Sequence, residues 1–403
     1  MLTTLRLHNF RTYLNAEIKL TGRHLVIGKN NSGKTNLCTA LQFLRATVNQ
    51  ELAEAAQVVP GGVSEIRNWS FDSDQVELSC SCQLPYENEP HKYTYDLQFG
   101  VSAAARGSQR DELELRVLAE KLLLSGPGFN DVALLTNNGR EVTMLHEEDF
   151  VRGKQRGTQP TTLSPRDGTM LSKLYELGTN RRAIAFRDYL SSWLVYTLDP
   201  VIIRHGWRTS KFAPDNLRLH GDNLAVVLFY LKNMETRRFV RLLDHVRLVE
   251  PELEDISFVP SPGQAPVPFV VLRSQPKASW DGLSDGTLRF LALAAIVEAG
   301  GAPHGRLPDG WSPLVVIEEP ENGVFPGHLR ALFNLIDERA GDRQFVVTSH
   351  SPYFINFFDA FRESVTVLRR RNERTEVVPV PPPDEKDPDR PLLAEQYSME
   401  LFD

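Results

Sequence analysis

One short stretch carries the residue types and the spacing of a loop that binds nucleotide phosphates. Gly28, Gly33, Lys34 and Thr35 match the pattern G-x-x-x-x-G-K-[ST]. Such glycines let backbone N–H groups curl around a phosphate, and a helix that begins near Thr35 adds its positive end. Lys34 would bridge the β- and γ-phosphates, and the Thr35 hydroxyl would bind Mg²⁺. The predicted binding loop consists of Gly28, Lys29, Asn30, Asn31, Ser32, Gly33, Lys34, Thr35 and Asn36.

Two adjacent acids supply the second half of this chemistry. The apolar run 314–317 leads directly into Glu318 and Glu319. The carboxyl end of a strand is the usual ligand edge of a parallel sheet. Glu318 would hold Mg²⁺, directly or through water, and Glu319 would orient and polarise the attacking water. Without other motifs, two adjacent acids after a strand are a solvated strand end as often as they are a functional pair. This interpretation therefore depends on the phosphate loop.

Two further segments fit the same nucleotide. "TSHSP" follows a predicted strand and places His350 where an imidazole can donate to a γ-phosphate. "LSDGTLRF" places Ser284 and Gly286 at the start of a helix, a second phosphate-binding N-terminus without a lysine. On its own this segment is most often an ordinary N-capped helix. One chain does not need two such loops for one nucleotide.

The elements that must position these residues follow from hydrophobic periodicity. The first twenty residues predict a strand pair, and 24–27 a strand that feeds the glycine loop. A helix follows over 35–47, so strand, loop and helix are in the required order. Strict alternation over 76–84 and 93–101 predicts antiparallel strands with one wet face. Asn137-Asn138-Gly139 is a hairpin signal.

The second half of the chain changes in character. Helical spacing runs from about 172 to 249, with Asp222 as the expected N-cap of a helix that extends to 249. Short apolar strands at 314–319 and 344–350 flank a predicted helix over 327–340. Strands that alternate with helices indicate a buried parallel sheet. The proline- and charge-rich segment 377–391 predicts a loose tail.

Composition sets the broad class. The chain has 403 residues, 41% of them hydrophobic, and a formal charge of −7, which argues against a generic basic nucleic-acid coat. The three cysteines, Cys38, Cys80 and Cys82, are too few to stabilise a chain of this length by disulfide bonds. We therefore expect reduced thiols that pack in the interior, rather than a pair of cysteines that binds a metal. Neither a signal peptide nor an apolar run of about 18 residues is present, so we expect a soluble cytoplasmic protein without membrane contact.

Five segments taken together resemble the RecF/SMC-like branch of the ABC-type ATPases. They are "NFRTY", "GKNNSGKTN", "LSDGTLRFLALAAI", "VVIEEPENGVFP" and "TSHSP". The chain looks similar to predicted AAA-type ATPases related to RecF and to the Old-family ATPase domain. The resemblance covers 1–45 and 282–370. It implies an α/β fold: an ABC-type P-loop ATPase head with a mixed or parallel core sheet, an antiparallel β subdomain and a helical lobe. ATP and Mg²⁺ are the implied cofactors.

The resemblance also implies roles in a homodimer. Ser284 and Gly286 would contact the γ-phosphate held by the opposite protomer, Glu319 would be the catalytic base, and His350 would act as a switch. Arg11 of "NFRTY" would lie near the nucleotide. The expected partners are a second copy and a separate effector protein, with DNA as a further possibility.

Several positions depart from the family pattern. Asp285 and Thr287 replace Gly and Gln of the LSGGQ signature, and Glu318 replaces the usual Asp. Phe325 stands where relatives commonly have His. The glutamine of the family's Q-loop is not identified; its candidates are Gln75, Gln155 and Gln159. The roughly fifty residues after Ser351 leave no room for the metal-dependent nuclease domain of Old-type proteins.

We expect four segments: 1–125 with the phosphate loop and the antiparallel β subdomain, 126–265 with a hairpin and a helical insertion, 266–380 with the remaining motifs, and a flexible tail at 381–403. The favoured function is an ATP-dependent dimerising switch in DNA repair or anti-phage defence that gates an effector. The alternative is a RecF-like protein that binds DNA directly through Arg369–Arg371, Arg374 and the cluster in "TNRRAIAFRDY". A self-contained nuclease or kinase and a transporter subunit are less well supported.

Overall fold

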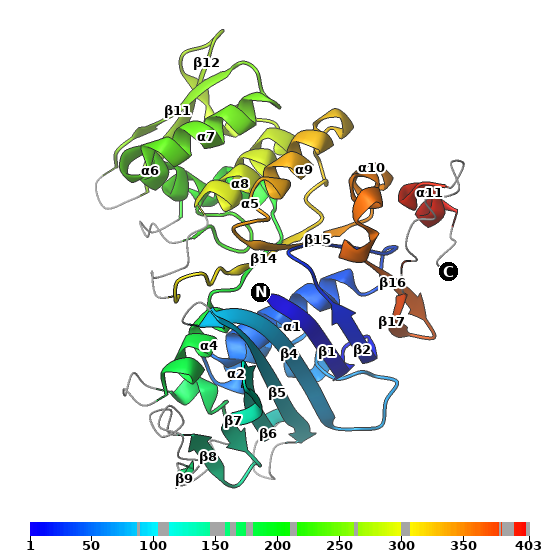
Figure 1. Cartoon of the computed structure of the whole chain (residues 1–403). Coiled ribbons are helices and arrows are strands. Elements are labelled where there is room, and N and C mark those ends of the chain that lie inside the picture. Colours follow the sequence, from blue (N-terminus) through cyan, green and yellow to red (C-terminus); the bar gives the residue numbers. More distant parts are fainter. Residues whose placement is uncertain are drawn as a thin grey trace.

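The fold is known from a computed structural model (Figure 1). It describes residues 1–86, 89–103, 113–145, 158–161, 167–174, 180–209, 216–261, 265–299, 307–378, 380 and 391–399. Two sheets and a group of helices form layers, with a six-stranded sheet in the middle. Among the described residues, no helix combines the length and the apolar composition needed to cross a bilayer.

The central sheet brings together strands from both ends of the chain. Its order is β10-β14-β15-β3-β16-β17, and all neighbours are parallel except β17, which is antiparallel to β16. This confirms the expected mixed core sheet. The strands are β3 Arg23–Ile27, β10 Leu194–Tyr196, β14 Leu314–Glu318, β15 Gln344–Ser349, β16 Val365–Arg371 and β17 Arg374–Val378.

An eight-stranded antiparallel sheet lies on one side of this core, in the order β2-β1-β4-β5-β6-β7-β8-β9. The expected opening strand pair and the hairpin at Asn138-Gly139 are both present. The face of β4 that was predicted to be exposed to solvent is partly buried, because Ser79 and Ser81 on that face are also buried. The strands are β1 Leu2–Phe10, β2 Tyr13–Lys19, β4 Gln75–Tyr86, β5 Glu89–Ala103, β6 Leu113–Gly126, β7 Phe129–Asn137, β8 Val142–Leu145 and β9 Thr158–Thr161.

Helices cover both faces of the central sheet. α1 and α4 lie on the side of the antiparallel sheet, and α5 to α9 form a helical lobe on the other side with a small sheet, β11 Leu253–Val259, β12 Val267–Leu272 and β13 Ala278–Ser279. The helices are α1 Lys34–Thr47, α2 Leu52–Ala55, α4 Arg181–Ser191, α5 Pro200–Gly206, α6 Leu224–Met234, α7 Thr236–Arg247, α8 Asp285–Ala299, α9 Leu329–Asp337, α10 Pro352–Ile355 and α11 Leu393–Ser398.

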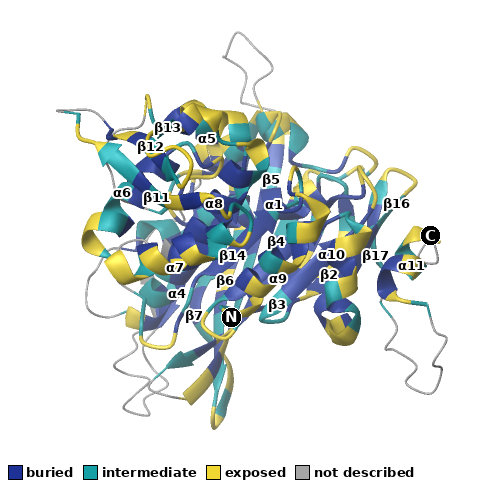
Figure 2. Ribbon diagram, turned by 90° about the horizontal axis from the view of Figure 1, so that it is seen from above, coloured by how far each residue is buried: buried dark blue, intermediate teal, exposed yellow. Residues whose placement is uncertain are grey.

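Two hydrophobic cores meet at the central sheet, whose strands appear as buried ribbon in Figure 2. Successive side chains of a strand point to opposite faces. Val316 and Val346 therefore pack with α1 and the antiparallel sheet, whereas Ile317 and Val347 pack with the helical lobe. Burial on both faces explains why these strands are continuously apolar rather than alternating. The thiols of Cys38, Cys80 and Cys82 are free and buried in the first core.

The helical region differs from its prediction in three ways. It contains β10, a three-residue strand that is too short to show a period. The predicted long helix breaks at Glu235 (φ −132°, ψ 49°) into α6 and α7. Asp222 is not its N-cap: Asn223 takes that position, and Asp222 pairs with Arg218 at 2.7 Å.

The expected segment boundaries also need correction. The boundary between 125 and 126 cuts a continuous sheet, because β6 pairs with β7. Part of the predicted flexible tail is ordered: Leu393 and Ala394 of α11 are buried, and Leu393 N–H donates to Asp359 Oδ1 at 2.9 Å. The remainder, 381–390 and 400–403, lies outside the described residues.

Candidate nucleotide-binding site

The predicted phosphate loop lies between β3 and α1 and is braced from two directions. Gly33 has φ 111°, a conformation that a residue with a side chain rarely adopts. A Cβ on Gly33 would also lie 2.4 Å from Thr375 Oγ1. The hydroxyl of Tyr13 donates to Gly33 O at 3.0 Å, and that of Thr375 donates to Ser32 O at 2.9 Å. The loop therefore has the fixed, glycine-dependent shape that a phosphate cradle requires.

Lys34 begins α1 and folds back along the loop. Its ammonium group donates to Gly28 O at 2.6 Å and to Lys29 O at 3.2 Å, and it lies 3.6 Å from Glu319 Oε1. Gly33 at the N-cap offers no side-chain oxygen to the first-turn N–H groups. A buried cation and uncapped N–H groups at a helix start suit a multivalent anion.

Glu318 lies where Thr35 can share a ligand with it. β14, β15 and β3 are parallel neighbours, so their carboxyl ends meet at one edge of the sheet. Thr35 donates its hydroxyl hydrogen to Glu318 Oε1. Thr197, which follows β10, donates to Glu318 Oε2 at 2.9 Å. Two hydroxyls therefore occupy both oxygens of this carboxylate.

Glu319 is held in a strained backbone conformation. Its φ is 44°, and its N–H donates to Thr348 O at 3.1 Å. Non-glycine residues in this region cost about 1–3 kcal/mol and concentrate at functional sites. Asn322 Nδ2 donates to Glu319 Oε2 at 2.8 Å, and His350 Nδ1 lies 3.2 Å from Oε1. Partial burial opposes ionisation, but Asn322, Lys34 and His350 outweigh it and lower the pKa of Glu319, so the carboxylate is charged at neutral pH.

A third acid of the same loop positions His350. Glu321 Oε1 accepts hydrogen bonds from Ser349 Oγ at 2.6 Å and from His350 N–H at 3.0 Å. Glu321 is buried, whereas the side chain of His350 is 42% exposed. Glu321 thus fixes the backbone from which a solvent-accessible imidazole projects beside Glu319.

Ser284 and Gly286 lie at the start of α8 in the helical lobe. Ser284 Oγ accepts from Thr287 N–H at 3.0 Å, so within its own chain it caps the helix. Ser284 is exposed, and its hydrogen bonds stay within the first turn of α8. Gly286 packs against Gly323, whose carbonyl oxygen would lie 2.6 Å from a Cβ at 286. Ser284 is therefore exposed to solvent, and within the described part of the chain none of its hydrogen bonds joins it to the phosphate loop.

Arg289 connects α8 with the acidic loop. Its guanidinium donates to Asn322 O and, at 2.8 Å, to Leu198 O. Asn322 in turn holds Glu319. The signature helix is therefore linked through one side chain to the end of β10 and to the loop of the expected catalytic base.

A cavity of about 350 Å³ adjoins the phosphate loop. Arg11 lies in it and donates through Nε to Asn36 Oδ1 at 2.7 Å, which confirms that the "NFRTY" arginine lies next to the loop. Trp69, which is 71% exposed, and Arg370 also line this cavity, together with two glutamates. An exposed aromatic ring in a cavity with guanidinium groups suits a nucleobase and its phosphates.

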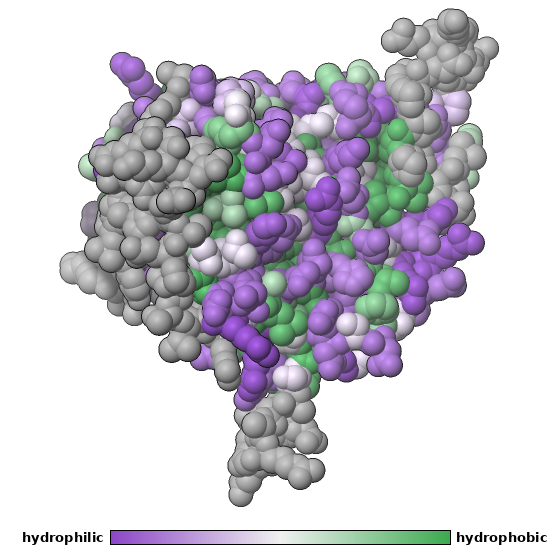
Figure 3. Space-filling model, turned by 60° about the horizontal axis from the view of Figure 1, so that its bottom comes forward, coloured by the Kyte–Doolittle hydropathy of each residue, from purple (hydrophilic) through white to green (hydrophobic). Residues whose placement is uncertain are grey.

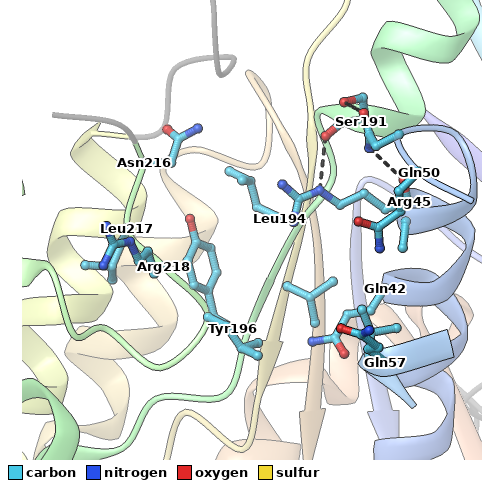
Figure 4. A pocket seen from close by; sticks show the side chains of 15 residues that line it. Gln42, Arg45, Gln50, Gln57, Ser191, Leu194, Tyr196, Asn216, Leu217 and Arg218 are labelled. Atoms are coloured by element: carbon cyan, nitrogen blue, oxygen red, sulfur yellow. Dashed lines mark hydrogen bonds between the residues drawn. The ribbon is translucent and has the colours of Figure 1, made fainter. Parts of the chain in front are cut away.

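A second cavity, of about 740 Å³, lies behind β10 (Figure 4). Arg45 of α1 projects into it, with its Nε donating to Ser191 O at 3.1 Å, and Tyr196 of β10 lies across from it. Its walls thus include the C-terminal end of α1, the helix that starts at the phosphate loop, and β10, which ends one residue before Thr197.

The residues present fit Mg²⁺ and a nucleoside triphosphate. Thr35 and Glu318 offer hydroxyl and carboxylate oxygens, the donor type that Mg²⁺ prefers. They are few, as expected for a metal whose other ligands are substrate phosphates and water. The glycine-dependent loop and Lys34 provide for the phosphates.

Two of the three Q-loop candidates lie on strands of the antiparallel sheet. Gln75 begins β4 of the antiparallel sheet, Gln155 lies outside the described residues, and Gln159 belongs to β9 of that same sheet. Sequence reasoning also missed Thr197, Glu321, Asn322 and Arg289. Only Glu321 and Asn322 had a local signal, since both lie in "EEPEN" directly after the recognised acids.

Two family models match the chain. The model of the AAA ATPase domain matches residues 1–85, and that of the "AAA domain, putative AbiEii toxin, Type IV TA system" matches residues 177–356. These two ranges contain every motif described above. These matches support a RecF/SMC-like ABC-type ATPase.

Solved structures of SMC heads show the same fold as this ATPase. An SMC head bound to the C-terminal winged-helix domain of ScpA is 14% identical, with a TM-score of 0.51 over 94% of this chain and 97% of that one. The SMC head from Pyrococcus furiosus with an extended coiled coil, bound to the C-terminal domain of ScpA, is 11% identical, with a TM-score of 0.50 over 94% and 95%.

One curated relative matches over a short stretch. The DNA replication and repair protein RecF of Nocardioides sp. (strain ATCC BAA-499 / JS614) is 39% identical over 62 residues. That stretch is 15% of the ATPase and 15% of the relative. The match therefore supports the family and does not extend to the activity of the whole relative.

Proposed function

We propose that the protein binds and hydrolyses ATP and that ATP joins two copies head to tail. The observation that carries this proposal is the convergence of Lys34, Thr35, Glu318, Glu319 and His350 at one sheet edge, while Ser284 faces solvent in the helical lobe.

Each side chain has a distinct role in this proposal. Lys34 and the loop N–H groups bind the phosphates, and Thr35 and Glu318 hold Mg²⁺, which when bound neutralises charge on the phosphate oxygens. Glu319, charged at neutral pH, orients the attacking water and accepts its proton. His350 donates to the γ-phosphate from its position 3.2 Å from Glu319. Arg11 and Trp69 line the space for the nucleoside.

The exposed loop at Ser284 supports a site shared between copies. Among the described residues, the Ser284 hydroxyl and the first-turn N–H groups of α8 make no hydrogen bond to the phosphate loop of the same chain. A second copy that approaches head to tail brings this helix start to the open side of the bound triphosphate. Two equivalent contacts then close the dimer, as a two-fold axis requires.

The test is the oligomeric state of Glu319→Gln. This variant keeps the shape of the site but cannot accept the proton, so ATP should trap a dimer visible by light scattering. Glu319→Gln combined with Ser284→Arg should bind ATP and stay monomeric. A Glu319→Gln protein that remains monomeric with ATP at every concentration tested would contradict the proposal.

We further propose that opening and closing of the dimer gate a separate effector in DNA repair or anti-phage defence. The support is the family match to RecF, to SMC heads solved with ScpA and to the AbiEii-type model. Pull-down with Glu319→Gln and ATP, compared with ADP, should recover the effector only in the ATP state. Recovery of equal amounts of effector with ATP and with ADP would contradict this second proposal, because effector binding would then not depend on dimerisation.

Direct DNA binding remains the second candidate, but the expected basic clusters are largely engaged. Arg369 pairs with Glu376 at 2.8 Å, and Arg370 pairs with Glu373. Arg182 is buried over the ring of Tyr86, and Arg187 pairs with Asp188. Figure 3 shows hydrophilic and hydrophobic residues interspersed over the lower face of the molecule. Steeply salt-dependent, ATP-dependent duplex binding would favour this alternative.

A further inference from the structure

The end of β10 presents a hydroxyl to the expected metal ligand. β10 and β14 are parallel, with Tyr196 paired to Ile317, so the next residues, Thr197 and Glu318, lie side by side at the carboxyl edge of the sheet. Thr197 Oγ1 donates to Glu318 Oε2 at 2.9 Å. Thr35 bonds the other oxygen. One carboxylate is therefore oriented from two elements that lie more than 150 residues apart in sequence.

The backbone around Thr197 is fixed on both sides. Its N–H donates to Leu219 O at 2.9 Å, and His220 Nδ1 lies 2.9 Å from its carbonyl oxygen. The next carbonyl, Leu198 O, accepts from Arg289 at 2.8 Å. The hydroxyl of Thr197 is thus held in place before any ligand arrives, as an orienting partner of a metal ligand must be.

The lengths of the two side chains are complementary. Threonine carries its oxygen directly on Cβ, so it reaches only a short distance from the strand end. Glutamate at 318 is one methylene longer than the aspartate usual in this family, and its carboxylate meets the short hydroxyl. An aspartate at 318 would withdraw from Thr197 by the length of that methylene, about 1.5 Å.

We propose that Thr197 is a positioning residue for the metal: it fixes Glu318 through Oε2 and leaves Oε1, beside Thr35, to face Mg²⁺. Thr197 and Glu318 form a matched pair, because a short hydroxyl at the end of β10 meets a carboxylate one methylene longer than that of aspartate. This inference rests on the proposed ATP site and adds a residue to it.

The first test compares Thr197→Val with Thr197→Ser. Valine keeps the branched shape and removes only the hydroxyl, whereas serine keeps the hydroxyl. The readout is the affinity of the ADP complex for Mn²⁺, measured by electron paramagnetic resonance. We expect about a 10-fold loss for valine, the usual effect of losing an orienting partner, and a value close to wild type for serine. ADP affinity without metal should be unchanged in both.

The second test addresses the matched pair. Glu318→Asp should weaken Mn²⁺ binding, and Thr197→Gln in that background should recover most of the loss, while Thr197→Gln alone should weaken binding because its longer side chain crowds Glu318. Effects that simply add in the double variant would overturn the pairing.

The proposed ATP site and the role of Thr197 can be overturned separately. If wild-type protein binds neither ADP nor Mn²⁺–ADP, the proposed ATP site itself is wrong. If wild type binds both, Lys34→Ala binds neither, and Thr197→Val retains wild-type Mn²⁺ affinity, only the role of Thr197 is overturned.

Discussion

Arg289 on the signature helix donates a hydrogen bond to the backbone carbonyl of Asn322, and the side chain of Asn322 holds Glu319. A movement of α8 therefore reaches the expected catalytic base through two residues. The same guanidinium holds Leu198 O, next to Thr197. The helix that would meet the partner's nucleotide is thus mechanically tied to the nucleotide site of its own chain.

Arg289→Ala should lower kcat for ATP hydrolysis about 10- to 100-fold, because a displaced base loses its alignment with the attacking water. The affinity for ATP should change little, since Arg289 does not line the phosphate loop. Steady-state ATPase assays and nucleotide titrations separate the two quantities. Arg289→Lys, which keeps the charge but cannot span both carbonyls, should resemble alanine; a lysine variant with wild-type kcat would show that charge alone matters.

Lys34→Ala should abolish stabilisation by ATP. The wild-type protein should gain several degrees in Tm with saturating ATP and Mg²⁺, because a ligand that binds only the native state raises stability. The variant loses the buried cation that faces the phosphates, so its Tm should not respond. Lys19→Ala, on the exposed face of β2, is the matched control and should respond like wild type.

Trp69→Ala should weaken ATP binding about 10-fold, since stacking on one base is worth about 1–3 kcal/mol. Inorganic triphosphate lacks a base, so its affinity should stay the same. Trp69→Phe keeps a ring and should retain most of the ATP affinity. Equal losses for ATP and inorganic triphosphate would place Trp69 outside the nucleoside cavity.

Much of the site was predictable because each motif lies next to a strand with a clear pattern. Gly28–Thr35 follows the strand at 24–27, and Glu318 and Glu319 follow the apolar run 314–317. Parallel pairing of β3, β15 and β14 then brings the motifs together, whereas the roles of the residues remain predictions.

Thr197 was not predictable by the same reasoning. It follows a three-residue strand with no measurable period, and its partner Glu318 is more than a hundred residues away. The helix break at Glu235 and the N-cap position of Asn223 were missed because hydrophobic periodicity does not fix the exact residue at which a helix begins or ends.

Glu298 predicts a pH dependence of stability away from the site. Burial opposes its ionisation, but His245 at 3.7 Å and hydrogen bonds from Arg339 and Arg241 outweigh burial and lower the pKa of Glu298 to about 2. A depressed folded-state pKa contributes stability that is present above the unfolded value, near 4.5, and is lost as pH falls toward 2.

Glu298→Gln should therefore reduce the free energy of unfolding at pH 7 by about 1–3 kcal/mol, as expected for lost hydrogen bonds to a charged group. The difference from wild type should shrink steadily between pH 5 and pH 3. Urea unfolding at several pH values measures it. Asp342→Asn, which removes an exposed partner of Arg339, is the control and should show little difference at any pH.

The brace on the phosphate loop has a consequence for biosynthesis. Thr375 supports Ser32 and crowds Gly33, and β3 lies between β15 and β16, both of which leave the ribosome more than 300 residues later. A nascent chain that stops before β15 therefore lacks both neighbours of β3, and one that stops before residue 375 lacks the hydroxyl that braces Ser32. We expect the phosphate loop to reach its final shape only near the end of synthesis.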